Sequence, residues 1–120
     1  MSKGDAFEND LLKLIFNGTA IADIAENDAT TPLATLYISL HTADPGEAGT
    51  QITNETAYTG YARVGVARTA GGFAVTGNSA SPVSNVVFGE CTGLPGAALT
   101  HFAIGTLISG AGKSLYSGTP

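Results

Sequence analysis

The sequence predicts a mainly β protein, an antiparallel β-sandwich or Greek-key (jelly-roll-like) domain that follows an N-terminal α-helix. Three observations predict this class. Apolar residues near the N-terminus follow helical spacing, later segments alternate apolar and polar residues with a period of two, and Gly- or Pro-containing turns separate these segments. The length of 120 residues fits one domain. Within it we expect a helical segment over 1–29 and a β-sandwich over 30–120, together one structural domain.

The helix is predicted from its capping residues and its apolar stripe. Asp5 is a suitable N-cap residue, Glu8 follows three positions later as in a capping box, and Asn17-Gly18 is a typical C-terminal stop. Either the stripe covers one end of the chain's own sandwich, or it packs against helices of neighbouring subunits. Its four residues are therefore candidate interface residues: Phe7, Leu11, Leu14 and Ile15.

The segments after the helix are predicted from alternation and turn residues. Residues from Ile21 to Ala25 are a candidate second helical turn before Asn27-Asp28, and Thr30 to Pro32 mark a break. The Gly71-Gly72 pair predicts a tight turn into a hairpin strand, and residues 43–60 and 77–82 are predicted loops. Strands are expected over residues 36–41, 61–69, 73–76, 85–88, 100–107 and 113–117.

Charge and composition exclude several classes of partner. The net charge is −5, and only five Lys and Arg residues are scattered along the chain, so we expect no nucleic-acid partner. An acidic surface and the absence of a long apolar segment argue against membrane insertion. Only 12% of the residues are charged, which leaves a neutral surface of the kind that packs against copies of itself. The N-terminus has no signal-peptide pattern, and a single cysteine suits synthesis in a reducing cytoplasm.

The sequence offers little catalytic or metal-binding chemistry. His41 and Asp44 are the one local pair that resembles metal ligands, and we interpret His41 as a strand-end residue hydrogen-bonded to loop backbone. Cys91 is interpreted as a small buried apolar residue, although a nucleophile beside His101 is the alternative. Nucleotide-binding and hydrolase motifs are missing from the sequence. We therefore expect a protein that is not an enzyme and has no catalytic, cofactor-binding or metal-binding residues.

Arg63 and Tyr61 are the remaining candidate interface residues. Arg63 lies within a predicted strand, on the face opposite Val64 and Val66. Two interpretations remain open: a solvated or loop-pairing charge whose stem covers apolar surface, or an arginine that pairs with a carboxylate of a neighbouring subunit. Tyrosines such as Tyr61 lie at the edges of cores and are also enriched at protein interfaces.

Several segments carry a resemblance that spans nearly the whole chain. They read MSKGDAFENDLLKLIF (1–16), LYISLHTADPGEAGTQ (36–51), ETAYTGYARVGVART (55–69), THFAIGT (100–106) and GKSLYSGT (112–119). Their order resembles that of small structural proteins of Escherichia and Salmonella phages and prophages commonly labelled phage tail fibre protein. The resemblance implies a virion protein with structural rather than catalytic roles for the matching residues Asp44, Pro45, Gly46, Tyr61 and Arg63.

The resemblance also implies how such a chain is used. We expect a tail or tail-fibre component in a multi-copy assembly, a trimer or higher, and the alternative is a decoration protein on the phage head. Expected partners are other copies of the chain and other phage structural proteins, with a host surface receptor as a further candidate. Similar proteins continue past the segment that matches Tyr116–Pro120 with more strand-like sequence. Without those strands, an open sheet edge would remain for a neighbouring subunit to fill.

Overall fold

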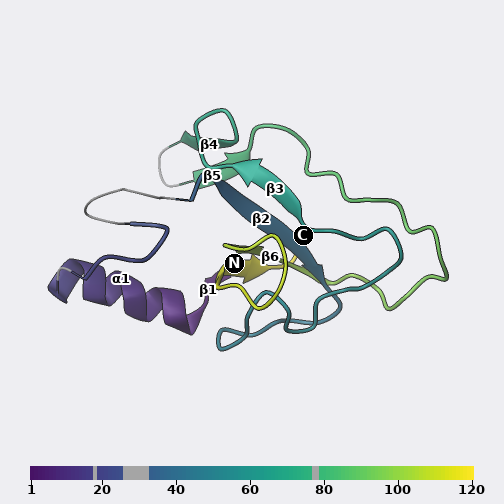
Figure 1. Cartoon of the computed structure of the whole chain (residues 1–120), viewed down its shortest axis with the longest axis horizontal. Helices are drawn as coiled ribbons and strands as arrows, with labels where there is room; N and C mark the ends of the chain where they lie inside the picture. Colours follow the sequence, from purple (N-terminus) through teal and green to yellow (C-terminus); the bar gives the residue numbers. More distant parts are fainter. Residues whose placement is uncertain (18, 26–32, 77–78) are drawn as a thin grey trace.

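The computed structural model describes residues 1–17, 19–25, 33–76 and 79–120, with all their side chains except that of Ile15 (Figure 1). The elements in chain order are β1 (Ser2–Lys3), α1 (Asp5–Asn17), β2 (Thr35–His41), β3 (Val64–Ala67), β4 (Phe73–Thr76), β5 (Ser79–Pro82), β6 (His101–Gly105) and β7 (Ser114–Gly118). An antiparallel five-stranded sheet has the order β1-β7-β6-β2-β3, and β4 pairs with β5 in a separate hairpin. The prediction of a mainly β, antiparallel fold with an N-terminal helix is confirmed.

Helix α1 begins one position away from the predicted cap. The Gly4 carbonyl accepts the first helical hydrogen bond from the Glu8 amide (3.0 Å), so Gly4 rather than Asp5 is the N-cap residue. A Cβ on Gly4 would lie 2.6 Å from the Ser114 carbonyl oxygen, so only glycine lets the helix start so close to β7. The Asp5 amide donates to the Glu47 carbonyl (2.8 Å). The helix ends at Asn17 as predicted, and Gly18 lies outside the described residues.

The predicted second helical turn is a tight reverse turn. Ile21 and Ala25 exchange both backbone hydrogen bonds, at 2.7 and 2.8 Å, and thereby close the turn. Asp23 has a φ of +65°, a left-handed conformation that interrupts a right-handed helix. The predicted Asn27-Asp28 end, the Thr30–Pro32 break and the boundary between residues 29 and 30 lie outside the described residues.

The predicted strands at 36–41, 100–107 and 113–117 are present as β2, β6 and β7. The strand expected over 61–69 is present only in part, as β3, because the segment that contains Glu55 and Thr56 occupies the edge of β2 beyond Ile38. The Thr56 amide donates to the Leu40 carbonyl (2.9 Å), and His41 forms a β-bridge with Glu55. Strand β3 therefore begins only at Val64, although the sequence alternates from residue 61.

The region between residues 69 and 88 differs most from expectation. Strand β4 pairs with β5, in a segment predicted to be a loop, and the strand predicted over 85–88 is absent from the described residues. The amides of Gly72 and Phe73 both donate to the Thr69 carbonyl (3.0 Å each), which turns β4 away from β3. The Val83 amide donates to the Gly72 carbonyl (2.9 Å) and extends the hairpin by one bond.

The two faces of the five-stranded sheet have different chemistry, because side chains alternate along each strand. On one face, paired positions are apolar, such as Ile38 with Ile104 and Leu40 with Phe102. On the other face, Ser39 and His41 are completely buried beneath loop residues that include the equally buried Gln51. The largest fully buried side chains among the described residues are thus polar ones, and much of the apolar face is only half-buried.

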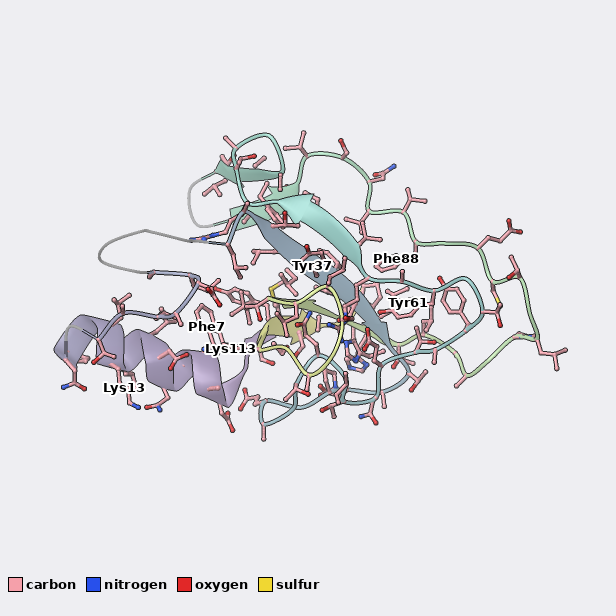
Figure 2. All side chains as sticks on the ribbon, viewed as in Figure 1. Phe7, Lys13, Tyr37, Tyr61, Phe88 and Lys113 are labelled. Atoms are coloured by element: carbon pink, nitrogen blue, oxygen red, sulfur yellow. The ribbon has the colours of Figure 1, made fainter. Side chains whose placement is uncertain are left out.

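Helix α1 covers one end of the apolar face. The Phe7 ring packs edge-on against the Tyr116 ring, with a centroid distance of 5.7 Å, and joins Ile21 and Leu115 in a buried cluster (Figure 2). Leu11 and Leu14 pack against the same cluster. The helix stripe, as far as it is described, therefore covers the chain's own sheet. Leu11 and Leu14 are only partly buried, so packing against helices of neighbouring subunits stays a prediction. The Ile15 side chain lies outside the described residues.

Candidate assembly interface

Arg63 lies at the centre of a buried polar cluster. Its Nε and Nη2 atoms donate to the two carboxylate oxygens of Glu55, at 2.7 and 2.8 Å, as a bidentate pair. Further bonds reach the carbonyl oxygens of Leu107 (2.9 Å) and Gly110 (2.8 Å). The side chains of Arg63 and Glu55 are 3% and 14% exposed. Arg63 thus has a carboxylate partner within its own chain, as a loop-pairing charge, and a contact with a neighbouring subunit stays a prediction.

Tyr61 completes this cluster. Its hydroxyl donates to Glu55 Oε1 (2.7 Å) and accepts a hydrogen bond from the Leu40 amide (3.2 Å). Burial and the hydrogen bond to Glu55 raise the pKa of Tyr61 far above its ordinary value of 10.0. The phenol therefore stays a neutral donor at any physiological pH. Tyr61 and Arg63 together attach the loop that contains Glu55 to the sheet.

The cluster also perturbs two acid–base groups. Burial tends to raise the pKa of Glu55, but the hydrogen bonds from Arg63 and Tyr61 outweigh it and hold that pKa below its ordinary value of 4.5. Burial lowers the pKa of His41 below its ordinary value of 6.5. His41 Nδ1 donates to the Thr53 carbonyl (2.8 Å), and Nε2 lies 2.8 Å from Ser39 Oγ. His41 therefore bonds to loop backbone, as the sequence interpretation held.

These shifts predict that acid weakens the fold in two stages. In the unfolded chain His41 takes up a proton near pH 6.5, whereas in the folded chain its lowered pKa delays protonation to a lower pH. The free energy of unfolding should therefore fall as pH drops below about 6.5. The contribution of Glu55 is present above pH 4.5 and is lost as pH falls through its lower folded pKa. Urea denaturation from pH 8 to pH 3 measures both stages. His41→Gln should remove the first stage, and His101→Gln, which keeps His41, should retain it; equal profiles for the two variants would contradict the assignment.

An aromatic stack joins the polar cluster to a long extended segment, residues 83–100, which we call the arm. The Tyr61 ring stacks on the Phe88 ring, with a centroid distance of 6.2 Å and an interplanar angle of 14° (Figure 2). The Tyr58 hydroxyl donates to the Gly89 carbonyl (2.6 Å), and the Thr92 amide donates to the Thr59 carbonyl (2.9 Å). The arm is therefore held in a defined position beside the sheet.

The arm leaves apolar side chains in contact with solvent. Leu94 is 91% exposed and Leu99 is 42% exposed, and Val83 and Val87 are also more than half exposed. Figure 1 shows the arm running past β3 to the end of the molecule that lies opposite α1. Several exposed apolar side chains thus lie along one segment, and protein interfaces regularly use such side chains.

A hollow of about 540 Å³ opens between the apolar face of the sheet and the β4–β5 hairpin. The sheet contributes residues such as Ile38, Phe102 and Ile104, and the hairpin contributes Phe73 and Ala80. None of the described side chains that line it is charged. The full lining is Met1, Leu36, Ile38, Phe73, Ala80, Pro82, Val86, Phe102, Ile104, Leu115 and Tyr116.

Sequence reasoning missed most of these exposed features. Leu12 and Phe16 lie four residues apart and are exposed on α1, outside the stripe that the sequence singled out. Cys91 is exposed on the arm, not buried as interpreted, and the strand predicted just before it, over 85–88, is absent from the described residues. The spacing of Val83, Val87, Leu94 and Leu99 matches neither a helix nor a strand. Only the scarcity of charge hinted at a surface that packs against protein.

The described residues contain neither a group of three or more side chains suited to hold a metal ion nor a helix long and apolar enough to cross a membrane. A family model described as "Gp80: Podophage GP4 fiber I protein gp80" matches residues 2–119. No curated protein is significantly similar to the chain.

Proposed function

The chain belongs to the Gp80 family, podophage GP4 fiber I protein, and from this premise we propose that it is a non-enzymatic structural subunit of a tail fibre that works in several copies. Membership of the family makes it a phage fibre-type protein and a component of the virion. The tail location, the multi-copy assembly and the Escherichia or Salmonella host belong to the proposal. So do its partners: other copies of the chain, other phage structural proteins and a host surface receptor.

The observation that carries the multi-copy proposal is the large surface of the single chain. A monomer of 12.1 kDa is expected to expose about 6,000 Å², whereas this chain exposes 7,139 Å². The excess, about 1,100 Å², is similar to the area of about 800 Å² that one partner buries in a standard interface. The exposed apolar side chains of the arm and the lining of the hollow are part of this surface, and assembly with other chains is a way to bury them.

The position in the particle is tested by cryo-electron microscopy of purified virions. A fibre subunit on the tail predicts density there in multiples of three or six. Density tiled over the head would instead assign the chain to capsid decoration and contradict the tail location. Light scattering of the purified protein is expected to give the mass of three or more chains, and a single-chain mass at high concentration would contradict the multi-copy role.

A further inference from the structure

We propose that the outer part of the arm docks into the apolar hollow of a second copy of this chain, so that each copy gives one arm and receives another. This inference rests on the proposed multi-copy role and specifies the contact that builds it. Both halves of the contact are present on one chain: a projecting segment with exposed leucines, and an apolar hollow with no charged side chain among its described lining residues.

The hollow is suited to an apolar protein segment. Its floor is the sheet, with Ile104 and Phe102, and its opposite wall is the hairpin, with Phe73 and Ala80. Most of these side chains are only half-buried, so the surrounding chain does not fill the space. Burying apolar surface in such a space is favourable by about 25 cal/mol for each Å² removed from water. An ionic ligand would find no charged side chain to pair with among the described residues that line the hollow.

The base of the arm lines the hollow of its own chain through Val86, but the outer part of the arm does not enter it. The base is held by the bond between the Val83 amide and the Gly72 carbonyl, and the middle of the arm by Tyr58 and Tyr61. Figure 1 shows the arm leaving the β4–β5 hairpin and running to the end of the molecule opposite α1, so its outer part lies away from the hairpin. Because the base and middle of the arm are already held, docking has to order only its outer part, which limits the loss of conformational entropy.

A second copy is the occupant that best fits the area and the charge. The chain exposes about 1,100 Å² more than a monomer of its mass should, which covers one of the two surfaces of about 800 Å² that a copy giving one arm and receiving another would use. Glu90 is the single charged residue of the arm, so its outer part offers an apolar surface to an apolar hollow. The contact joins two different surfaces, and such contacts generate closed rings or open filaments, which agrees with an assembly of three or more chains.

Two variants with matched controls test the contact by the mass of the intact protein in light scattering. Leu94→Asp places a charge on the arm, and Ala80→Glu places one in the wall of the hollow. Each should raise the concentration needed for assembly at least tenfold. Leu12→Asp, at another exposed leucine, and Ser81→Glu, on the opposite face of β5 from Ala80, should assemble like the wild type. Circular dichroism of each variant verifies that the chain is folded.

Mixing the two blocked variants identifies which surfaces meet. The Leu94→Asp chain keeps an intact hollow, and the Ala80→Glu chain keeps an intact arm, so one productive contact remains for each pair. The mixture should therefore form complexes of two chains, whereas each variant alone stays a single chain. A mixture that stays entirely single-chain would contradict docking of the arm in the hollow.

The other outcomes separate this inference from the proposed function. A wild type that assembles, together with a Leu94→Asp variant that assembles equally well, overturns arm docking and leaves the fibre role standing. If Leu12→Asp blocks assembly and Leu94→Asp does not, the exposed face of α1 is the interface and the arm is not. A wild type that is a single chain at high concentration overturns both.

Discussion

Replacement of Arg63 by alanine is expected to lower the free energy of unfolding by about 3 kcal/mol. The guanidinium makes two bonds to Glu55 and two to the carbonyl oxygens of Leu107 and Gly110. The Glu55 side chain is 14% exposed in the intact protein, and without the guanidinium its carboxylate keeps the Tyr61 hydroxyl as its hydrogen-bond donor. Removal of one partner of a buried ion pair lowers the free energy of unfolding by more than the intact pair contributes to it, because the remaining charge stays desolvated.

Urea denaturation at pH 7 measures this change, and the exposed ion pair between Lys113 and Asp10 supplies the control. Both of its side chains are about 30% exposed, so Lys113→Ala is expected to cost less than about 1 kcal/mol. Equal effects of Arg63→Ala and Lys113→Ala would show that burial of the Arg63 cluster contributes nothing to stability. The loop that contains Glu55 and the aromatic stack on Phe88 depend on the same cluster, so Arg63→Ala should also increase amide hydrogen exchange in the arm.

Phe7→Ala should have an effect of similar size, about 3 kcal/mol, because it leaves a cavity under helix α1. Phe7 is 7% exposed and contacts the Tyr116 ring, whereas Phe16 on the same helix is 77% exposed. Phe16→Ala is therefore the matched control, with an expected change within about 0.5 kcal/mol.

Urea or thermal unfolding of both variants at one protein concentration gives the comparison, because assembly makes apparent stability depend on concentration. A Phe7→Ala variant as stable as Phe16→Ala would mean that the helix does not rest on the sheet through this ring. A large effect of Phe16→Ala that disappears on dilution would place Phe16 in an interface between chains.

The sequence by itself determined those elements whose signals are local. Helix α1 has its stripe and its stop within 13 residues, and β2, β6 and β7 alternate over enough positions to be recognised. The Asp44-Pro45-Gly46 turn is also local: the Gly46 amide donates to Asp44 Oδ1 (2.9 Å), and Gly46 has a φ of +74°.

Only the tertiary structure decided which partner each segment takes. The alternating sequence from residue 61 forms a strand only from Val64, because residues 54–56 occupy the edge of β2 beyond Ile38. Arg63 finds its carboxylate eight residues earlier, and its two carbonyl partners more than forty residues later. Ser79–Pro82 has a composition typical of a loop and becomes a strand because β4 turns back on it. The exposed arm and the hollow arise from these long-range pairings. The pairings depend on contacts between segments far apart in the chain, which a local stretch of sequence does not specify.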